Sequence, residues 1–286
     1  MMNRKTKEAL MFSLLRGCAV VVVLTLVIII GYIFIGGIGK WSVDFFTKNP
    51  APDSHGALVM GGVFAPLVGT LILMVLVLII SIPIGVLGAI FLVERQGKSR
   101  ISRAWWIVVN NLAGVPSIVW GLLGVALLVY YLHFGLSLIA AAITLSLMVL
   151  PIIMVATKEA IEAIPASIRE ASVSLGATRW QTVRHHVLPY SASGIMTGVI
   201  LSLARAGGET APILVTGVAV NAGIPGSLSD QFQALPYYIY LMTQTTNRTQ
   251  AYAMANAAAL LLIVLIIGMS LGAIIMRSRY REKYKW

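Results

Sequence analysis

Long apolar runs alternate with shorter polar segments along the chain. Each run is long enough to cross the hydrocarbon core of a bilayer, which is about 30 Å thick and needs about 20 residues in a helix. The runs lie at 15–36, 64–93, 107–131, 136–156, 190–220 and 253–276. This pattern predicts an all-α integral membrane protein with six transmembrane helices. We expect a transmembrane domain at 15–276, flanked by a cytoplasmic N-terminal segment at 1–14 and a basic cytoplasmic tail at 277–286.

Positive charges are distributed unevenly among the polar segments. Of the 21 lysines and arginines, all except Lys40, Lys48, Arg205 and Arg248 lie at the termini or in the loops that share their side of the membrane. Lysine and arginine are enriched in cytoplasmic loops. We therefore expect both termini and the loop at 158–189 to face the cytoplasm.

The composition supports a membrane protein and excludes several other classes. Of the 286 residues, 58% are hydrophobic and only 11% are charged, whereas soluble domains carry about 25% charged residues. The net charge of +11 comes from loops and termini beside the membrane, so we expect membrane lipid around the chain and no nucleic-acid partner. The single cysteine, Cys18, excludes an intramolecular disulfide.

The loop between the fourth and fifth runs is predicted to fold as two short helices. Ser167 and Glu170 have the S-x-x-E spacing of a capping box, in which both side chains accept hydrogen bonds from backbone N–H groups at a helix start. This spacing predicts a helix that begins at Ile168. Gly176 then supplies the left-handed backbone conformation that commonly closes a helix.

A second capping box, at Thr178 and Gln181, predicts a second helix, which Pro189 is expected to end. Apolar residues share one face of each predicted helix at i, i+3 and i+7. They are Ile168, Ala171 and Leu175 in the first helix and Trp180, Val183 and Val187 in the second. The loop is therefore expected to present an apolar side to a docking partner.

Some residues of this loop also match a known motif. They are Glu170, Ala171, Ser172, Gly176, Leu188 and Pro189. Together they resemble the EAA loop of bacterial ABC importer permeases, E-A-A-x3-G-x9-I-x-L-P. The sequence departs from it at Ser172, where the motif has alanine, and at His186, where it has isoleucine. The resemblance implies a type I ABC importer permease fold, in which this loop forms coupling helices that enter a cleft on a cytoplasmic ATPase.

The fifth run contains two charged residues, Arg205 and Glu209. An arginine in a transmembrane helix costs about 2.5–3.5 kcal/mol on insertion scales. Glu209 lies four residues farther on, one helical turn along the same face. Two interpretations are open at this point. Either the pair only neutralises itself, or Arg205 helps an anion to cross while Glu209 holds the guanidinium, with Gly207, Gly208 and Pro212 loosening the helix around the pair.

Further stretches, which span most of residues 60–245, are similar to one branch of that family, the PstA-type permease subunits of phosphate-specific ABC transporters. The most branch-specific stretch contains Arg205, Glu209, Thr210 and Pro212. The resemblance implies import of inorganic phosphate through the cytoplasmic (inner) membrane, with Arg205, Glu209 and Thr210 on the anion path. It also implies a PstC-type permease as heterodimer partner, a PstB-type ATPase dimer and a PstS-type phosphate-binding protein.

No catalytic site is expected in this chain. Residues 96–99, Q-G-K-S, look like the end of a phosphate-binding loop, but Leu92 stands where that motif needs glycine. The adjacent His185 and His186 would point about 100° apart on a helix, which disfavours a metal site. We expect the chain to bind no metal or cofactor itself, so that ATP and Mg are bound by the partner ATPase.

Small residues predict close helix packing. Gly194 with Gly198, and Gly268 with Gly272, are small-xxx-small pairs of the kind that let helices approach each other closely. These pairs predict where the helices of the bundle contact one another.

Two stretches predict irregular elements. Pro116, beside the polar Asn110 and Asn111, is expected to break or kink the helix near the membrane boundary. The apolar stretch at 231–242 is too short to span a bilayer and predicts an interfacial or re-entrant helix at the outer mouth.

Three other functions remain open from the sequence. The chain could transport another oxyanion or be the PstC-type sibling of the same transporter. It could be a proton-coupled secondary transporter that uses Glu209 as the proton carrier. It could also be a regulatory protein that binds an ATPase without transport.

Overall fold

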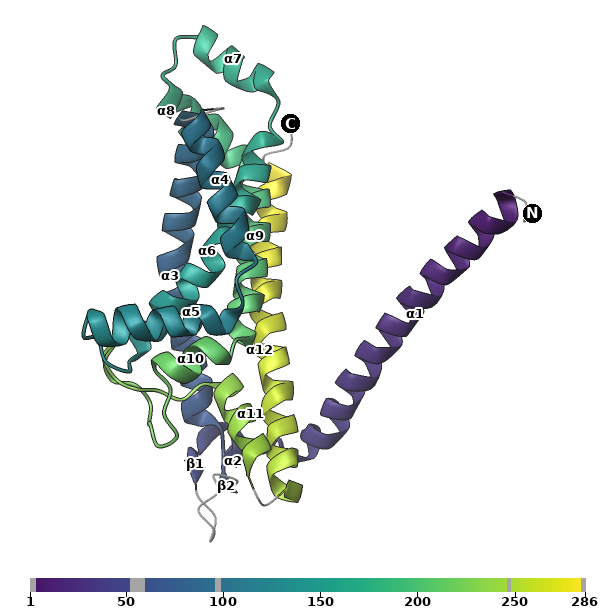
Figure 1. The fold of residues 1–286 in the computed structure, drawn as a ribbon, viewed down its shortest axis with the longest axis vertical. Coiled ribbons are helices and arrows are strands. Elements are labelled where there is room, and N and C mark those ends of the chain that lie inside the picture. The colour runs from purple at the N-terminus through teal and green to yellow at the C-terminus, as the bar shows by residue number, and fades with distance from the viewer. Residues whose placement is uncertain (1–3, 52–59, 96–98, 246–247, 284–286) are drawn as a thin grey trace.

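The computed structural model describes residues 4–51, 60–95, 99–245 and 248–283, and within them the chain is almost entirely helical (Figure 1). The α-helices are α1 (Arg4–Gly37), α2 (Val43–Thr47), α3 (Phe64–Ile90), α4 (Arg100–Ala113), α5 (Ser117–Gly124), α6 (Leu138–Glu162), α7 (Ala166–Ser174), α8 (Arg179–Thr182), α9 (Leu188–Gly208), α10 (Ala211–Thr216), α11 (Leu235–Gln244) and α12 (Arg248–Lys283). Residues 96–98 of the Q-G-K-S segment lie outside the described residues.

Short elements complete the fold. Three π-helical turns in the described residues adjoin the α-helices. The turn η2 (Phe91–Arg95) extends α3, and η3 (Val125–Tyr131) extends α5. The turn η4 (Val183–Val187) joins α8 to α9. A 3-10 turn, η1 (Ile38–Lys40), follows α1. Strands β1 (Pro50–Ala51) and β2 (Met60–Gly61) form one antiparallel pair.

Five helices in the described residues are long and apolar enough to cross a membrane, and a sixth span exists if one bent pair is counted as one. The bent pair shows that the predicted third span at 107–131 is not one continuous helix. Its two halves, 100–113 and 117–131, meet at an angle of 103°. The break falls at Pro116, as expected, because a proline has no N–H and forces the preceding residue out of the helical conformation.

The predicted fifth span, 190–220, is also wrong at both ends. The helical span begins earlier, at Arg179, and ends at Gly208. Glu209 takes an extended conformation, with φ −79° and ψ 130°, and the chain restarts as the short helix α10. Both α5 and α10 lie across the axis of the bundle (Figure 1). Hydropathy alone could not reveal this break, because the residues on both sides of it are apolar.

The core of the bundle lies where α6 packs against α3 and α9. Gly194 and Gly198 allow the close approach of α9 to α6, since a Cβ at Gly198 would lie 2.5 Å from the Cβ of Ala156. By contrast, a Cβ at Gly268 or Gly272 would meet no described atom within 4 Å. The first small-residue pair is therefore a packing site within this chain, and the second faces away from it.

The close packing at Gly198 and the open space at Gly272 allow a matched test of the helix contacts. We expect Gly198→Leu to lower the melting temperature of the purified protein in detergent, because the added side chain overlaps Ala156 and overpacking costs about 1–3 kcal/mol. The control Gly272→Leu has open space around it and should melt like the wild type. Equal melting temperatures for Gly198→Leu and Gly272→Leu would contradict the packing described here.

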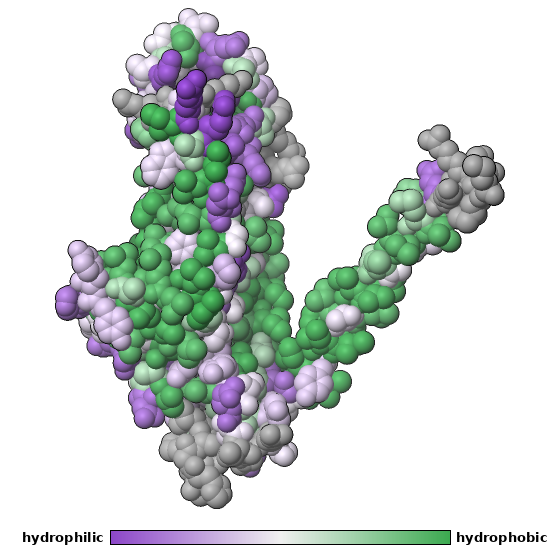
Figure 2. Space-filling view, in the orientation of Figure 1, coloured by the Kyte–Doolittle hydropathy of each residue, from purple (hydrophilic) through white to green (hydrophobic). Residues whose placement is uncertain are grey.

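Helix α1 stands apart from the bundle over most of its length (Figure 1). None of its apolar membrane-spanning window is buried. It contacts the bundle near its C-terminal end, where Gly37 lies so close to α12 that a Cβ would be 2.6 Å from the backbone of Asn256. Apolar residues cover both α1 and the middle of the bundle (Figure 2).

The short helix predicted at 231–242 is confirmed as α11. It lies at the end of the bundle opposite α7 and α8 (Figure 1). Its first residue is fixed to α3, because the N–H of Leu235 donates to the hydroxyl of Thr70 at 2.8 Å. The preceding segment caps the start of α6, since the N–H groups of Leu138 and Ile139 donate to the carbonyls of Asp230 and Leu228.

Candidate functional site

Helices α7 and α8 project from one end of the bundle and form the predicted loop of two short helices (Figure 1). The first capping box is absent. Helix α7 begins at Ala166, directly after Pro165, and has no side-chain cap. Ser167 therefore lies inside the first turn, where its backbone is already helical, and only a residue with a non-helical backbone can act as the N-cap.

The turn between the two helices is confirmed. Gly176 has φ +85°, the left-handed conformation that glycine adopts without steric cost. The second capping box is also present. The N–H of Gln181 donates to the hydroxyl of Thr178, and the N–H of Thr178 donates to the Gln181 side chain at 2.8 Å.

Pro189 does not end the second helix, contrary to the prediction. The helical span continues from Arg179 to Gly208, and Pro189 lies in the first turn of α9. Just before it, the chain widens into the π-helical turn η4, and the N–H of Leu188 donates to the carbonyl of Val183, five residues back. A proline interior to a helix removes a backbone donor and crowds the preceding turn, and the wider turn accommodates it.

The predicted apolar faces are divided between the bundle and solvent. Val183 and Val187 are buried, and Ile168 packs partly against them. Leu175 and Trp180, in contrast, are 89% and 60% exposed. The outer side of the loop thus carries large apolar side chains that this chain does not cover.

Ser172, the departure from the motif, connects the two short helices. Its hydroxyl lies 2.9 Å from the hydroxyl of Thr182, and both side chains are buried. The Thr182 hydroxyl also donates to the carbonyl of Thr178 at 3.2 Å. Ser172 is therefore the donor to Thr182, and this hydrogen bond holds α7 against α8.

If the chain transports a substrate, as its resemblance to ABC importer permeases implies, we expect Ser172→Ala to change uptake by no more than about twofold, because Thr182 keeps its own acceptor and one neutral hydrogen bond contributes only about 0.5–1.5 kcal/mol. Initial uptake rates of the reconstituted transporter measure this effect. A much larger loss of uptake would show that the hydrogen bond between the two hydroxyls is itself needed for transport.

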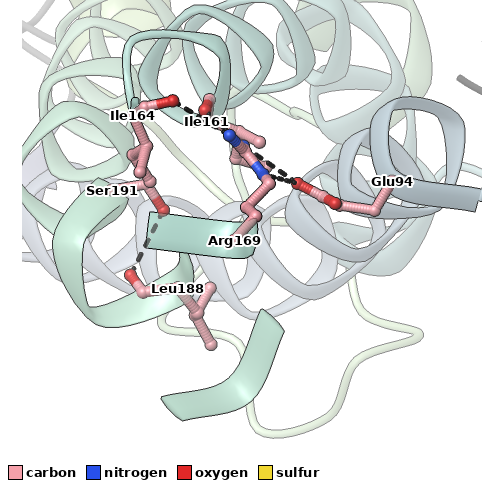
Figure 3. A network of polar contacts seen from close by, with 6 residues as sticks. All are labelled: Glu94, Ile161, Ile164, Arg169, Leu188 and Ser191. Atoms are coloured by element: carbon pink, nitrogen blue, oxygen red, sulfur yellow. Dashed lines mark hydrogen bonds and ion pairs between the residues drawn. The ribbon is translucent and has the colours of Figure 1, made fainter. Parts of the chain in front are cut away.

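Sequence reasoning missed a charged network at the base of the loop (Figure 3). Arg169 on α7 forms an ion pair with Glu94 of η2, with 3.1 Å between Nη2 and Oε1. The same guanidinium donates to the carbonyls of Ile164 and Ile161 at 2.9 and 2.8 Å. The side chains of Arg169 and Glu94 are only 25% and 21% exposed. No local pattern marks two residues so far apart in sequence as partners.

The second candidate site lies at the far end of α9. Arg205 is in the last turn of α9, and its Nε lies 3.6 Å from Oε1 of Glu209. The negative end of the helix dipole also favours a cation at this position. Glu209 is the C-cap of α9 and not a helical residue. The side chains are 37% and 18% exposed for Arg205 and Glu209.

The guanidinium of Arg205 keeps unused hydrogen-bonding capacity. In the described part of the chain its Nε is buried without a hydrogen-bond partner, because the 3.6 Å to Glu209 allows an ion pair but is too long for a hydrogen bond. Thr210, the second residue of the break, is the N-cap of α10, but its hydroxyl makes no capping hydrogen bond. Gly207 lets this end of α9 approach α3, since a Cβ there would lie 2.7 Å from Met74. The guanidinium of Arg205 and the hydroxyl of Thr210 can therefore donate hydrogen bonds to an anion.

The predicted site residues thus fall into two groups at opposite ends of α9. Glu170 and Ala171 are exposed on α7, while Ser172 is buried beside Gly176. Leu188 and Pro189 lie at the base of the loop, in the first turn of α9. Arg205, Glu209 and Thr210 gather at the break after α9. The long helix between the groups connects the loop directly to the break.

A family model described as "Binding-protein-dependent transport system inner membrane component" matches residues 81–281. The phosphate transport system permease protein PstA 1 of Mycobacterium tuberculosis is 37% identical over 221 residues, covering 76% of this chain and 71% of the relative. The phosphate transport system permease protein PstA of Haemophilus influenzae is 33% identical over 270 residues, covering 92% of each.

A solved structure has the same fold. A chain in the crystal structure of a bacterial alginate ABC transporter, in complex with an alginate pentasaccharide-bound periplasmic protein, superposes with a TM-score of 0.66. It covers 96% of both chains at 16% identity. This likeness supports the predicted ABC importer permease fold.

Proposed function

Because the chain belongs to the family of binding-protein-dependent transport system inner membrane components, we propose that it is the permease subunit of an ATP-driven importer of inorganic phosphate. Family membership makes it a multi-pass inner membrane protein without catalytic activity or cofactor of its own, which works with a separate ATPase and a binding protein. The phosphate substrate is proposed from the relatives named as phosphate permeases, which match most of the chain.

The observation that carries the choice of an anion is the free donor capacity of Arg205 at the helix break. Phosphate carries one to two negative charges near neutral pH and accepts several hydrogen bonds. Arg205 offers it a cation, and Thr210 offers a hydroxyl. Glu209, at 3.6 Å from Arg205, is close enough to hold the guanidinium when no anion is bound. We propose that Arg205, Glu209 and Thr210 line the anion path.

Energy for import comes from the ATPase. Moving one elementary charge against the membrane potential costs about 2.3 kcal/mol per 100 mV, so phosphate costs roughly 2–5 kcal/mol before any concentration gradient. A passive pore cannot accumulate phosphate against this cost. We propose that Glu170, Ala171, Ser172, Gly176, Leu188 and Pro189 belong to the coupling loop, through which the ATPase drives the spans. The exposed Leu175 and Trp180 support docking of this loop into another protein.

The orientation of the chain is part of the proposal. Helix α1 begins, and α12 ends, toward the end of the molecule that carries α7 and α8 (Figure 1). Hydrophilic residues gather at that end (Figure 2). The concentration of arginine and lysine in the termini and the adjoining loops favours the cytoplasm for this end. On this basis both termini and the coupling loop face the cytoplasmic ATPase.

The partners that we propose are a PstC-type permease, a PstB-type ATPase dimer and a PstS-type binding protein. The permease pairing is supported by α1, an apolar helix whose spanning window is uncovered by the rest of this chain. Its exposed side chains provide a surface for a second membrane subunit.

Stimulation of the ATPase tests the substrate. The assembled complex is reconstituted in proteoliposomes, and ATP hydrolysis is measured with different loaded binding proteins. We expect a phosphate-loaded phosphate-binding protein to raise ATP hydrolysis and to deliver phosphate. Stimulation by a sulfate- or molybdate-loaded binding protein instead would assign the chain to another oxyanion.

A further inference from the structure

The ion pair at the base of the coupling loop joins three elements that are distant in sequence. Arg169 comes from α7, Glu94 from the π-helical turn that follows α3, and the carbonyls of Ile161 and Ile164 from the last turn of α6 and the connection after it (Figure 3). Within the described ranges, the other two ion pairs join residues only four positions apart. Arg169 thus makes the one long-range ion pair of the described chain.

The hydrogen bonds of Arg169 tie α7 to two other parts of the bundle. The last carbonyls of a helix lack partners within the helix, and the negative end of the helix dipole attracts a cation. The guanidinium of Arg169 donates to one such carbonyl, that of Ile161 in the last turn of α6, and to the carbonyl of Ile164, two residues past the helix. Its Nε and Nη2 both donate to one carboxylate oxygen of Glu94, at 3.2 and 3.1 Å. Displacing α7 therefore breaks charge-assisted hydrogen bonds to α3 and α6 together.

The rest of α7 is held weakly. Ile168 packs partly against the cluster that contains Ile161 and Val183, and Ser172 bonds α8. The outward residues of α7, including Glu170 and Val173, are exposed. A push on the outer side of α7 therefore reaches α3 through the Arg169–Glu94 ion pair as well as through the packing of Ile168, while α6 also follows α7 directly along the chain.

We propose that Arg169 is a positioning residue for energy coupling, and that its contact with Glu94 transmits movement of α7 to the cytoplasmic ends of α3 and α6. The inference deepens the coupling role proposed above for this loop and rests on it. It does not depend on which substrate is carried. In this role Arg169 touches neither nucleotide nor substrate and acts through Glu94 and the two carbonyls.

The test measures ATP hydrolysed per substrate molecule imported by the whole reconstituted complex. We expect Arg169→Gln to raise this ratio about tenfold while the complex still assembles, because the charge-assisted bonds that link α7 to α3 are lost. Arg103→Gln, which removes an exposed arginine of α4 outside the coupling loop, is the matched control and should leave the ratio unchanged. A role in stability alone would lower assembly, hydrolysis and uptake together and leave the ratio constant.

A double-mutant cycle tests the partnership itself. If Arg169 acts through Glu94, then Arg169→Gln combined with Glu94→Gln should raise the ratio no more than the larger single effect. Effects that multiply would show that the two residues act independently, and this would overturn the proposal. Should Arg169→Gln not assemble, the near-isosteric Glu94→Gln carries the test, and an unchanged ratio for it would also overturn the proposal.

The experiment separates this inference from the proposed substrate. If phosphate is the wrong substrate, the wild-type complex imports no phosphate, and the ratio is then measured with the substrate that its binding protein delivers. If only the role of Arg169 is wrong, the wild type imports phosphate and Arg169→Gln has the wild-type ratio.

Discussion

Replacing Arg205 by alanine is expected to reduce phosphate uptake about 10- to 100-fold in a complex that still assembles. The variant removes the cation with free donors at the helix break, and hydrogen bonds to charged groups contribute about 1.5–3 kcal/mol each. Assembly should persist because Arg205 forms no hydrogen bond to another described residue. Uptake of radiolabelled phosphate into proteoliposomes, together with size-exclusion chromatography of the complex, measures both quantities.

A second variant decides between the two interpretations of the pair. Combining Arg205→Ala with Glu209→Ala removes both charges, so that nothing remains to be neutralised. If the pair only neutralises itself, this double variant imports phosphate normally. If Arg205 meets the anion, uptake stays as low as in Arg205→Ala. Arg205→Lys keeps the charge but loses the forked donor geometry, and we expect it to retain part of the uptake.

Gly176→Trp is expected to leave the permease in the membrane but to uncouple it from the ATPase. Gly176 has φ +85° and no neighbouring atom within 4 Å of the position where a Cβ would lie. An indole there is strained and projects from the outer side of the loop, where the ATPase is proposed to dock. Uptake should fall at least about tenfold, while ATP hydrolysis no longer responds to the loaded binding protein.

Gly176→Ala separates backbone strain from bulk. A residue with a Cβ in the left-handed conformation costs roughly 1–2 kcal/mol, but alanine adds almost no volume. We expect this variant to keep most of the uptake. Normal uptake by Gly176→Trp would count against docking at the loop, and equal loss in both variants would assign the effect to the backbone.

Local sequence patterns predicted the loop well where the chain forms its own contacts. Gly176 and the capping box of Thr178 and Gln181 depend only on residues within a few positions, and both are present. Ser167 does not cap a helix, although its spacing to Glu170 is the same as that of Thr178 to Gln181, because α7 already begins at Ala166, directly after Pro165. A cap motif is therefore decided by the residues that precede it as well as by its own spacing.

The ends and bends of the transmembrane helices were predicted less accurately from the sequence than the loop was. Hydropathy located the six apolar segments but not the 103° bend between α4 and α5 or the end of α9 at Gly208. The pairing of Arg205 with Glu209 was predicted from a continuous helix, yet it forms across a helix end. Neither Glu94 nor Arg169 could be recognised as a site residue, because their partnership exists only after α3, α6 and α7 have packed.

One measurement tests the central claim that energy enters this permease from ATP. The complex is reconstituted in proteoliposomes with ATP and Mg on the side of the ATPase and with the loaded binding protein on the other side. A protonophore is present, so that no proton gradient can form. The account predicts that phosphate accumulates in proportion to the ATP hydrolysed. Uptake that needs no ATP and collapses with the protonophore would contradict it and would make Glu209 a proton carrier.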